Sequence, residues 1–205
     1  MNYFVHLLHR LRNKGNFPKV FLDAGAHFGE TNYTIRSVYP ESRVISFEAN
    51  PNCEPMLNQH GMEFVICLLG NEDKESVPFY INPNDVVSTG CSVYKEKTEH
   101  FANARTIELP MYRLDTIIPS EIVPDFLKMD VQGAELAILD GASRILPSIK
   151  WVYLEVSFVP CNEGAPLFKE VSDYLYNKGY QISDMCDPTY VKDELLQCNF
   201  LFERK

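Results

Sequence analysis

The chain has 205 residues, which is the length of one ordinary α/β domain. Apolar residues make up 45% of it and aromatic residues 12%, enough to bury a sizeable core, so the composition excludes a disordered chain. The net charge of −9 argues against nucleic acid as a partner, because binding to a phosphate backbone needs a basic face. A small neutral or cationic partner fits this charge better.

Residues 1–17 are predicted to form an N-terminal helix ahead of a single domain over 18–205. The apolar side chains of this helix fall on one face: Phe4, Leu7, Leu8 and Leu11. We expect this face to pack on the domain or over its active site, and the alternative is a helix lying on an anionic membrane. No apolar run reaches the roughly 18 residues that span a bilayer, so stable membrane insertion is not expected.

The chain has six cysteines, with no CxxC pair and no Cys/His cluster at zinc-ligand spacing. Scattered cysteines in a chain of this length, without an evident signal peptide, indicate reduced thiols. We therefore expect a cytoplasmic protein.

Short apolar runs alternate with helical stretches along the chain. The runs cover 20–22, 44–47, 64–69, 126–129 and 151–156. The helical stretches cover 29–38, 53–60, 134–146 and 165–178. Runs that are apolar at every position are typical of parallel strands buried on both faces. The alternation predicts an α/β fold with a doubly wound sheet.

Two regions depart from this alternation. Residues 77–81 and 106–113 have the pattern of extra strands, which we expect to form an inserted antiparallel pair. The stretch 82–105 between them has few periodic signals, and a loop of that length in a compact domain is usually a lid or a binding loop. At the end of the chain, 180–183 and 199–203 are predicted as two closing strands, the last of them antiparallel.

The first strand runs into a glycine turn, KVFLDAGAHFGET, which is typical of a nucleotide-binding corner. Gly25 and Gly29 let the backbone approach a ligand, and the free amides at the start of the next helix point at it. Glu48 ends the second strand, where an acidic side chain can accept hydrogen bonds from both hydroxyls of a ribose. Asp23 ends the first strand and is expected to face the same ligand.

These features are shared with dinucleotide sites, so the two kinds of ligand must be distinguished. The GxG of the dinucleotide turn is absent, and Asp23 would place negative charge beside a pyrophosphate. A cationic sulfonium with a free amino group tolerates that acid better, which favours S-adenosylmethionine over NAD. Two alternatives stay open: an NAD-dependent sugar oxidoreductase or epimerase, and a catalytically inactive nucleotide-binding module.

Further polar residues follow the later strands. Gly70 and Asn71 form a turn that could lie against an adenine. Asp130 ends the fourth strand and is expected to face Asp23 across the ligand, where strand order reverses. Lys128 needs a carboxylate partner if buried, and Asp130 or Glu155 is the natural candidate.

Deprotonation of an alcohol calls for a base within hydrogen-bond reach, and the candidates are Glu155, Asp130 and His27. Asp130, Glu135 and Glu155 also form the one carboxylate set that could hold Mg²⁺. The string DVQGAE lacks the dense cluster that would favour a metal, so we assign no metal ligand. Glu135 equally suits a capping role in the first turn of a helix.

Several strings together resemble the FkbM-type methyltransferases: DAGAHFGET, SFEANP, LGNEDKE, LDTI and FLKMDVQGAELAILDGA. The most specific of them is KMDVQGAE. The resemblance covers roughly 18–202 and implies a class I methyltransferase fold with strand order 3-2-1-4-5-7-6. It also implies O-methylation of a hydroxyl on a saccharide, a glycan or a glycosylated small molecule.

The resemblance also bears on single residues. Ser92, in the string STGCS, corresponds to a serine of the family near the cofactor. The family usually has asparagine at the position of His27 and glutamate at that of Gln132. The expected cofactor-binding residues are Asp23, Gly25, His27, Gly29, Glu48, Ala49, Gly70, Asn71, Ser92 and Asp130. The sequence leaves open a homodimer, or a module of a larger enzyme.

Overall fold

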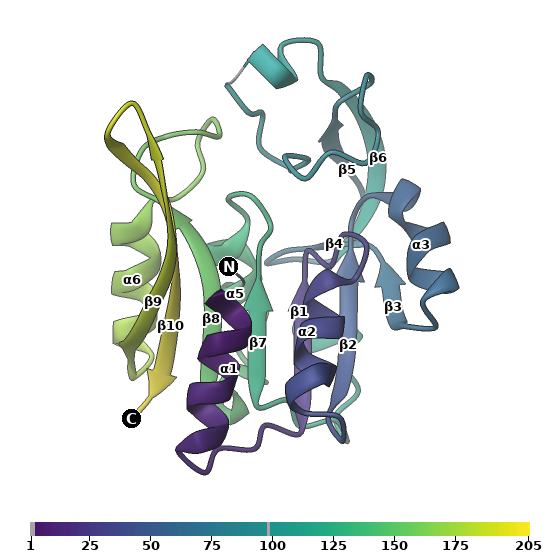
Figure 1. Cartoon of the computed structure of the whole chain (residues 1–205). Helices are drawn as coiled ribbons and strands as arrows, with labels where there is room; N and C mark the ends of the chain where they lie inside the picture. Colours follow the sequence, from purple (N-terminus) through teal and green to yellow (C-terminus); the bar gives the residue numbers. More distant parts are fainter. Residues whose placement is uncertain (1–2, 98) are drawn as a thin grey trace.

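The computed structural model describes residues 3–97 and 99–205 and is built around a seven-stranded sheet (Figure 1). The order of the strands is β3-β2-β1-β7-β8-β10-β9. β10 runs antiparallel to both neighbours, and the other adjacent strands pair in parallel. The strands are β1 (Val20–Ala24), β2 (Arg43–Glu48), β3 (Glu63–Ile66), β7 (Phe126–Met129), β8 (Trp151–Ser157), β9 (Tyr180–Val191) and β10 (Glu194–Arg204).

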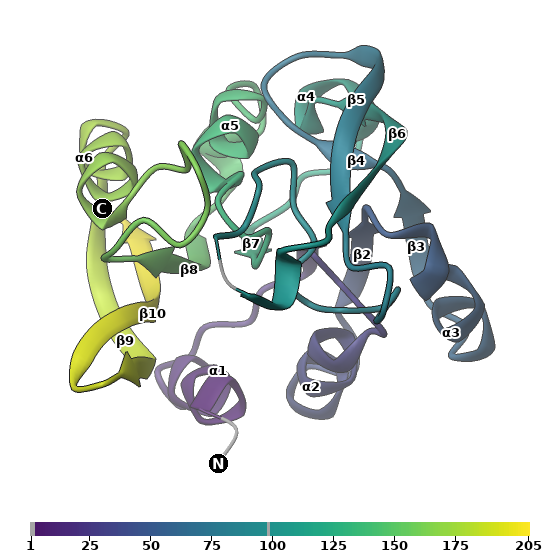
Figure 2. The same cartoon turned by 90° about the horizontal axis from the view of Figure 1, so that it is seen from above.

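This sheet confirms the doubly wound fold and the strand order expected from the sequence. Helices cover both of its faces, which is why the central strands are apolar at nearly every position. α1 (Tyr3–Asn13) and α2 (Glu30–Val38) lie on one face, and α5 (Glu135–Asp140) and α6 (Phe168–Asn177) lie on the other (Figure 2). The short α3 (Glu54–Gln59) and α4 (Leu114–Ile117) complete the α-helices among the described residues.

The N-terminal helix α1 packs directly on the sheet. The four side chains predicted to share one face are buried in a cluster with residues of β1, β7 and β8: Phe4, Leu7, Leu8 and Leu11. Their partners include Phe21, Phe126 and Tyr153. None of the described helices is both long enough and apolar enough to cross a membrane.

A second, three-stranded sheet has the order β4-β6-β5. β5 (Lys74–Ile81) and β6 (Arg105–Tyr112) form the antiparallel pair predicted as an insertion. The third member, β4 (Leu68–Leu69), corrects the prediction of one strand over 64–69. The amide of Cys67 still bonds Glu48 O of the main sheet at 2.9 Å, whereas that of Gly70 bonds Tyr112 O at 3.0 Å. The apolar run continues through the change of sheet, so its pattern cannot reveal the break.

Two further boundaries differ from the prediction. The helix expected over 134–146 ends at Asp140, where a side chain at Gly141 would lie 2.0 Å from Gly70 O. The closing strands are longer than predicted and meet at a two-residue turn, Lys192 and Asp193, with φ values of 48° and 66°. Positive φ at both central residues is the geometry of a type I′ hairpin, which usually selects Asn-Gly. Lys-Asp is not a recognisable signal for this turn.

The carboxyl ends of β1, β2, β7 and β8 meet at one edge of the main sheet. The segment between β5 and β6, which includes the 3₁₀ turn at Glu99–Phe101, crosses above these strand ends (Figure 2). This arrangement encloses a pocket between the sheet and the insertion.

Candidate active site

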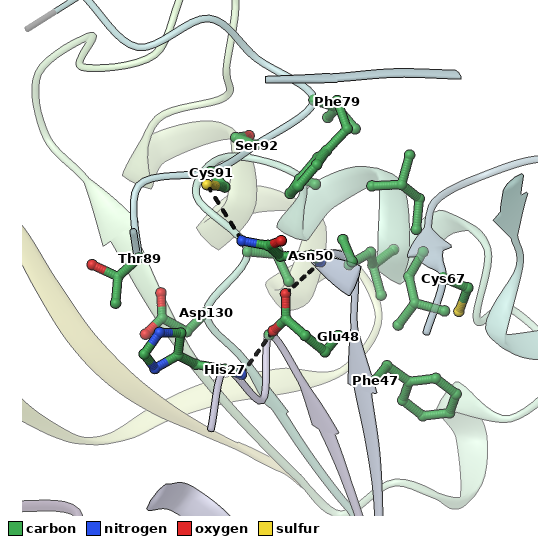
Figure 3. A pocket seen from close by; sticks show the side chains of 18 of the residues that line it. His27, Phe47, Glu48, Asn50, Cys67, Phe79, Thr89, Cys91, Ser92 and Asp130 are labelled. Carbon is green, nitrogen blue, oxygen red and sulfur yellow. Dashed lines mark hydrogen bonds between the residues drawn. The ribbon is translucent and has the colours of Figure 1, made fainter. Parts of the chain in front are cut away.

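The pocket at the strand ends has an empty volume of about 730 Å³. Residues that follow β1, β2 and β7 form its floor, and the segment 88–93 lies over it (Figure 3). The polar residues among those lining it include His27, Glu48, Asn50, Thr89 and Asp130. Its apolar wall includes Phe47, Leu68, Leu69, Phe79, Val93 and Ile138.

Gly25 opens the pocket at the end of β1. Its φ is +75°, and a Cβ atom at this position would lie 1.8 Å from the backbone oxygen of Asp130. No other residue can therefore occupy the position without moving the end of β7. The amides of Gly25 and Ala26 donate to Phe47 O at 2.9 and 3.1 Å, which ties the turn to β2.

Glu48 ends β2 and is only 8% exposed. Its Oε1 accepts from the amide of Asn50 at 2.7 Å, and its Oε2 accepts from the amide of His27 at 2.7 Å (Figure 3). Burial raises the pKa of Glu48, and the two amides oppose this rise. Each oxygen keeps a lone pair. The two backbone bonds fix the orientation of the carboxylate before any ligand binds.

Asn50 is a site residue that the sequence analysis missed. Its Nδ2 donates to Val86 O at 2.6 Å, while its Oδ1 accepts from the amide of Asn52 at 3.1 Å. On the other side of the pocket, His27 Nε2 lies 2.8 Å from Val87 O. These contacts fasten the 82–105 segment to the strand ends. An asparagine directly before Pro51 is a helix-cap signal that could have identified it.

Lys128 and Asp23 form a buried ion pair beneath the pocket, with Nζ 3.1 Å from Oδ1. The prediction that Asp130 or Glu155 would pair with Lys128 was wrong. The parallel register places Asp23 of β1 directly beside Lys128 of β7. Burial by itself lowers the pKa of Lys128, but the carboxylates of Asp23 and Asp130 outweigh it and hold the pKa above its ordinary value. Asp23 is fully buried and does not line the pocket.

Three carboxyl groups and two side-chain amides gather near the ends of β7 and β8. Gln132 Nε2 donates to Asp130 Oδ1 at 2.8 Å and lies 3.3 Å from Glu155 Oε2. The same oxygen of Glu155 accepts from Gln197 Nε2 at 3.0 Å. Burial, with the nearby charges of Asp130 and Glu135, raises the pKa of Glu155 to about 7. Glu155 is therefore poised to gain or lose a proton near neutral pH.

A second, small cavity with room for about one water-sized group lies beside these side chains. Gln132 and Gln197, the two donors to Glu155, both line it. The other residues around it include Ser157, Cys161, Asn162 and Leu167, and none of those that line it carries a formal charge. Glu155 itself lines neither cavity, and Gln132 connects it to Asp130 of the main pocket.

The predicted site residues divide into two groups. Those that line the main pocket are Gly25, His27, Glu48, Ala49, Ser92 and Asp130. Those outside its lining are Asp23, Gly29, Gly70, Asn71 and Glu155.

Three of the residues outside the lining, the two glycines and Asn71, lie elsewhere in the fold. Gly29 starts α2 at φ +90°, and a Cβ there would meet Met62 Sδ at 2.1 Å. The amide of Gly70 donates to Tyr112 O of β6, and Asn71 is exposed. Leu68 and Leu69, which precede them in the chain, do line the main pocket.

Ser92 lines the pocket, but its hydroxyl is engaged by the protein. Its Oγ donates to Gln132 O at 2.8 Å and accepts from the amide of Tyr94 at 3.1 Å. Across residues 3–97 and 99–205, no group of three or more His, Cys, Asp or Glu side chains is arranged to hold a metal ion.

Glu135 is only 4% exposed, so the charge on its buried carboxyl group should affect the stability of the folded protein. Burial raises the pKa of Glu135 to about 7. Backbone amides that donate to it, including that of Gly133, oppose this rise. An unfolded glutamate titrates near pH ~4.3, so stability falls as the pH rises from there through the folded pKa. Glu135→Gln keeps the acceptor oxygen and removes the charge. We expect it to be more stable than wild type at pH 8 by on the order of 2–3 kcal/mol.

Urea unfolding at pH 8 and pH 5 checks this expectation. The advantage of Glu135→Gln should shrink as the pH is lowered, because both proteins then carry a neutral side chain in the folded state. The same difference at both pH values would contradict the account of Glu135.

A sheet of this order with a single antiparallel strand, a glycine turn after β1 and an acid at the end of β2 define the class I fold of S-adenosylmethionine-dependent methyltransferases. The family model for the methyltransferase FkbM domain matches residues 23–182 of this sequence, which is most of the chain. The protein therefore belongs to the FkbM methyltransferase family.

Individual relatives agree with this assignment. Methyltransferase sdnD of Sordaria araneosa is 23% identical over 197 residues, covering 79% of this chain and 73% of that protein. The crystal structure of methyltransferase FkbM from Methylobacillus flagellatus KT has a TM-score of 0.57 at 17% identity, covering 89% of this chain. This chain spans 43% of that one. Magnesium protoporphyrin IX methyltransferase of Synechocystis PCC 6803, solved with bound SAM, has a TM-score of 0.55 at 10% identity, covering 99% of this chain and 79% of that one. The solved structures, at these identities, show the shared fold.

Proposed function

We propose that this protein transfers a methyl group from S-adenosylmethionine to a hydroxyl oxygen of a saccharide, a glycan or a glycosylated small molecule. The observation that carries the proposal is the chain of contacts from Asp130, which lines the Glu48 pocket, through Gln132 to Glu155, whose pKa is about 7. The main pocket suits an adenosyl cofactor, and Glu155 suits the proton of an acceptor hydroxyl.

The main pocket fits S-adenosylmethionine in shape and in charge. Gly25 leaves the end of β1 without a side chain, and the oriented carboxylate of Glu48 is able to accept hydrogen bonds from ribose hydroxyls. The apolar wall around Leu69 and Phe79 suits an adenine ring. Asp130 supplies negative charge for a cationic ligand. When bound, the cofactor supplies an electrophilic methyl group on a positively charged sulfur.

The residues of this chain would then handle the proton of the acceptor. An acceptor hydroxyl that approaches Glu155 past Gln132 and Gln197 would give its proton to this carboxylate as the hydroxyl oxygen gains the methyl group. Side-chain amides of Gln132, Asn162 and Gln197 border the small second cavity and can bond one hydroxyl group there. Its uncharged lining favours a neutral acceptor over a phosphorylated one.

The two alternatives from the sequence have different outcomes. Membership of a methyltransferase family places the chain apart from NAD-dependent oxidoreductases and epimerases. An inactive module would bind the cofactor without turnover, and the assay below distinguishes it. We further propose that 18–205 form the methyltransferase domain and that 1–17 are an N-terminal helix packed on it.

The test is methyl transfer from isotope-labelled S-adenosylmethionine to a panel of neutral sugars, glycosides and aliphatic alcohols, with amines and phenols as a contrasting set. We expect labelled product among the sugars and glycosides, with the methyl carbon bonded to oxygen by NMR. Transfer only to nitrogen or carbon, or no transfer to any hydroxyl in the panel by a protein that binds the cofactor, would overturn the proposal.

A further inference from the structure

Gln132 has an unusual backbone conformation that the surrounding structure enforces. Its φ is +54°, in the left-handed region that is strained for residues other than glycine. Its carbonyl oxygen accepts from Ser92 Oγ at 2.8 Å and from Asn162 Nδ2 at 2.6 Å. Two side chains from distant segments thus clamp one strained residue. Strain held in this way is typical of functional sites.

The clamped backbone aims the side chain of Gln132 between two acids. Its single amide nitrogen lies 2.8 Å from Asp130 Oδ1 and 3.3 Å from Glu155 Oε2. Asp130 lines the main pocket, whereas Glu155 touches two residues of the second cavity. An amide nitrogen carries two hydrogens, so it can donate to both acids at once.

The charges around Glu155 explain why a donor is needed there. Asp130 and Glu135 are the nearby acids, Lys128 is the nearby base, and the thiols of Cys161 and Cys198 face the same region. A carboxylate beside two other acids is unfavourable unless donors compensate it. Gln132 and Gln197 are the donors bonded to Glu155 in the part of the chain that is described.

We propose that Gln132 is a positioning residue that links the cofactor pocket to the second cavity, holding Asp130 and Glu155 in fixed relation through one bridging amide. This inference rests on the proposed function for its catalytic meaning, but the link itself is independent of any bound molecule. Ser92 and Asn162 serve it by fixing the backbone of Gln132. Gln197 is a matched control, because it bonds the same oxygen of Glu155 without touching Asp130.

The test follows the side-chain carboxyl carbons of ¹³C-labelled aspartate and glutamate by NMR as the pH is varied, in the protein without added ligand. Asp130→Asn and Glu155→Gln assign the two resonances. In wild type, the Asp130 resonance should respond at the titration midpoint of Glu155. Gln132→Met should raise that midpoint by roughly one pH unit, the effect of losing one hydrogen bond to a charged group. It should also weaken the response of Asp130, leaving only the part due to direct charge repulsion between the two acids.

The control variant separates a bridge from a general loss of hydrogen bonding. Gln197→Met should raise the midpoint of Glu155 and keep the response of Asp130. Asn162→Leu keeps the side chain of Gln132 but removes one of the two hydrogen bonds that hold its backbone, so it should weaken the response of Asp130. This variant tests the inference if Gln132→Met does not fold. An unchanged midpoint and response in Gln132→Met, or equal loss of the response in Gln197→Met, would overturn the inference.

The outcomes also separate this inference from the proposed function. If the resonances change as expected but the protein methylates no hydroxyl, the proposed function is refuted and the bridging role of Gln132 stands. Methyl transfer to a hydroxyl with no change in the resonances of Gln132→Met would refute the bridge and keep the function.

Discussion

Replacing Asp23 with alanine is expected to destabilise the folded protein by about 3–5 kcal/mol, the cost of leaving a buried charge without its partner. Asp23 is fully buried, and Lys128 is 6% exposed. In the variant, the ammonium group keeps Gly25 O at 2.8 Å but loses the carboxylate at 3.1 Å. Urea unfolding of Asp23→Ala beside wild type measures the difference.

The double variant Asp23→Leu/Lys128→Met is the control for this prediction. It removes both charges and keeps apolar volume, so it should be more stable than Asp23→Ala although two residues are changed. A double variant at least as unstable as Asp23→Ala would show that the uncompensated charge is not the cause. The pair would then act mainly through packing at the end of β1.

Replacing Glu155 with glutamine is expected to lower kcat for methyl transfer by roughly 10²–10⁴-fold, which is the usual contribution of a general base. Glutamine keeps the shape and the hydrogen bonds but accepts no proton. KM for S-adenosylmethionine should change little, because Glu155 lies outside the main pocket. Steady-state kinetics with the acceptor identified from the panel check both expectations.

The pH dependence of the wild-type enzyme gives a second expected result for the same residue. Glu155 has a raised pKa of about 7, so it is protonated below that pH and cannot accept a proton. The rate should therefore fall as the pH drops below about 7, and this acidic limb should be absent in Glu155→Gln. An unchanged kcat in the variant, or the same limb in both proteins, would exclude Glu155 as the base.

The central sheet could be predicted from the sequence because its strands are buried on both faces and interrupted by helices. The change of sheet at Cys67 could not be predicted, since apolar residues continue across it. The hairpin after Tyr180 was predicted too short, because Lys192 and Asp193 are unusual residues for a type I′ turn.

The pocket lining was predictable where a residue stands at the end of a strand, as Gly25, Glu48 and Asp130 do. Prediction was wrong where tertiary register decides the partner, as in the pairing of Lys128 with Asp23. The strained backbone of Gln132 and its clamps from Ser92 and Asn162 depend on contacts between distant segments, and no local pattern carries that information.

The most direct test of the account is a calorimetric titration of S-adenosylhomocysteine and NAD into wild type and Glu48→Gln. The glutamine keeps an acceptor oxygen but loses the charge that we propose receives the ribose hydroxyls. Asn52→Ala serves as a nearby control outside the pocket lining. We expect wild type and Asn52→Ala to bind S-adenosylhomocysteine and not NAD. The affinity of Glu48→Gln should be weaker by about 1.5–3 kcal/mol, roughly 10- to 150-fold. Binding of NAD in place of the adenosyl ligand, or equal affinity in Glu48→Gln and wild type, would contradict the assignment of this pocket.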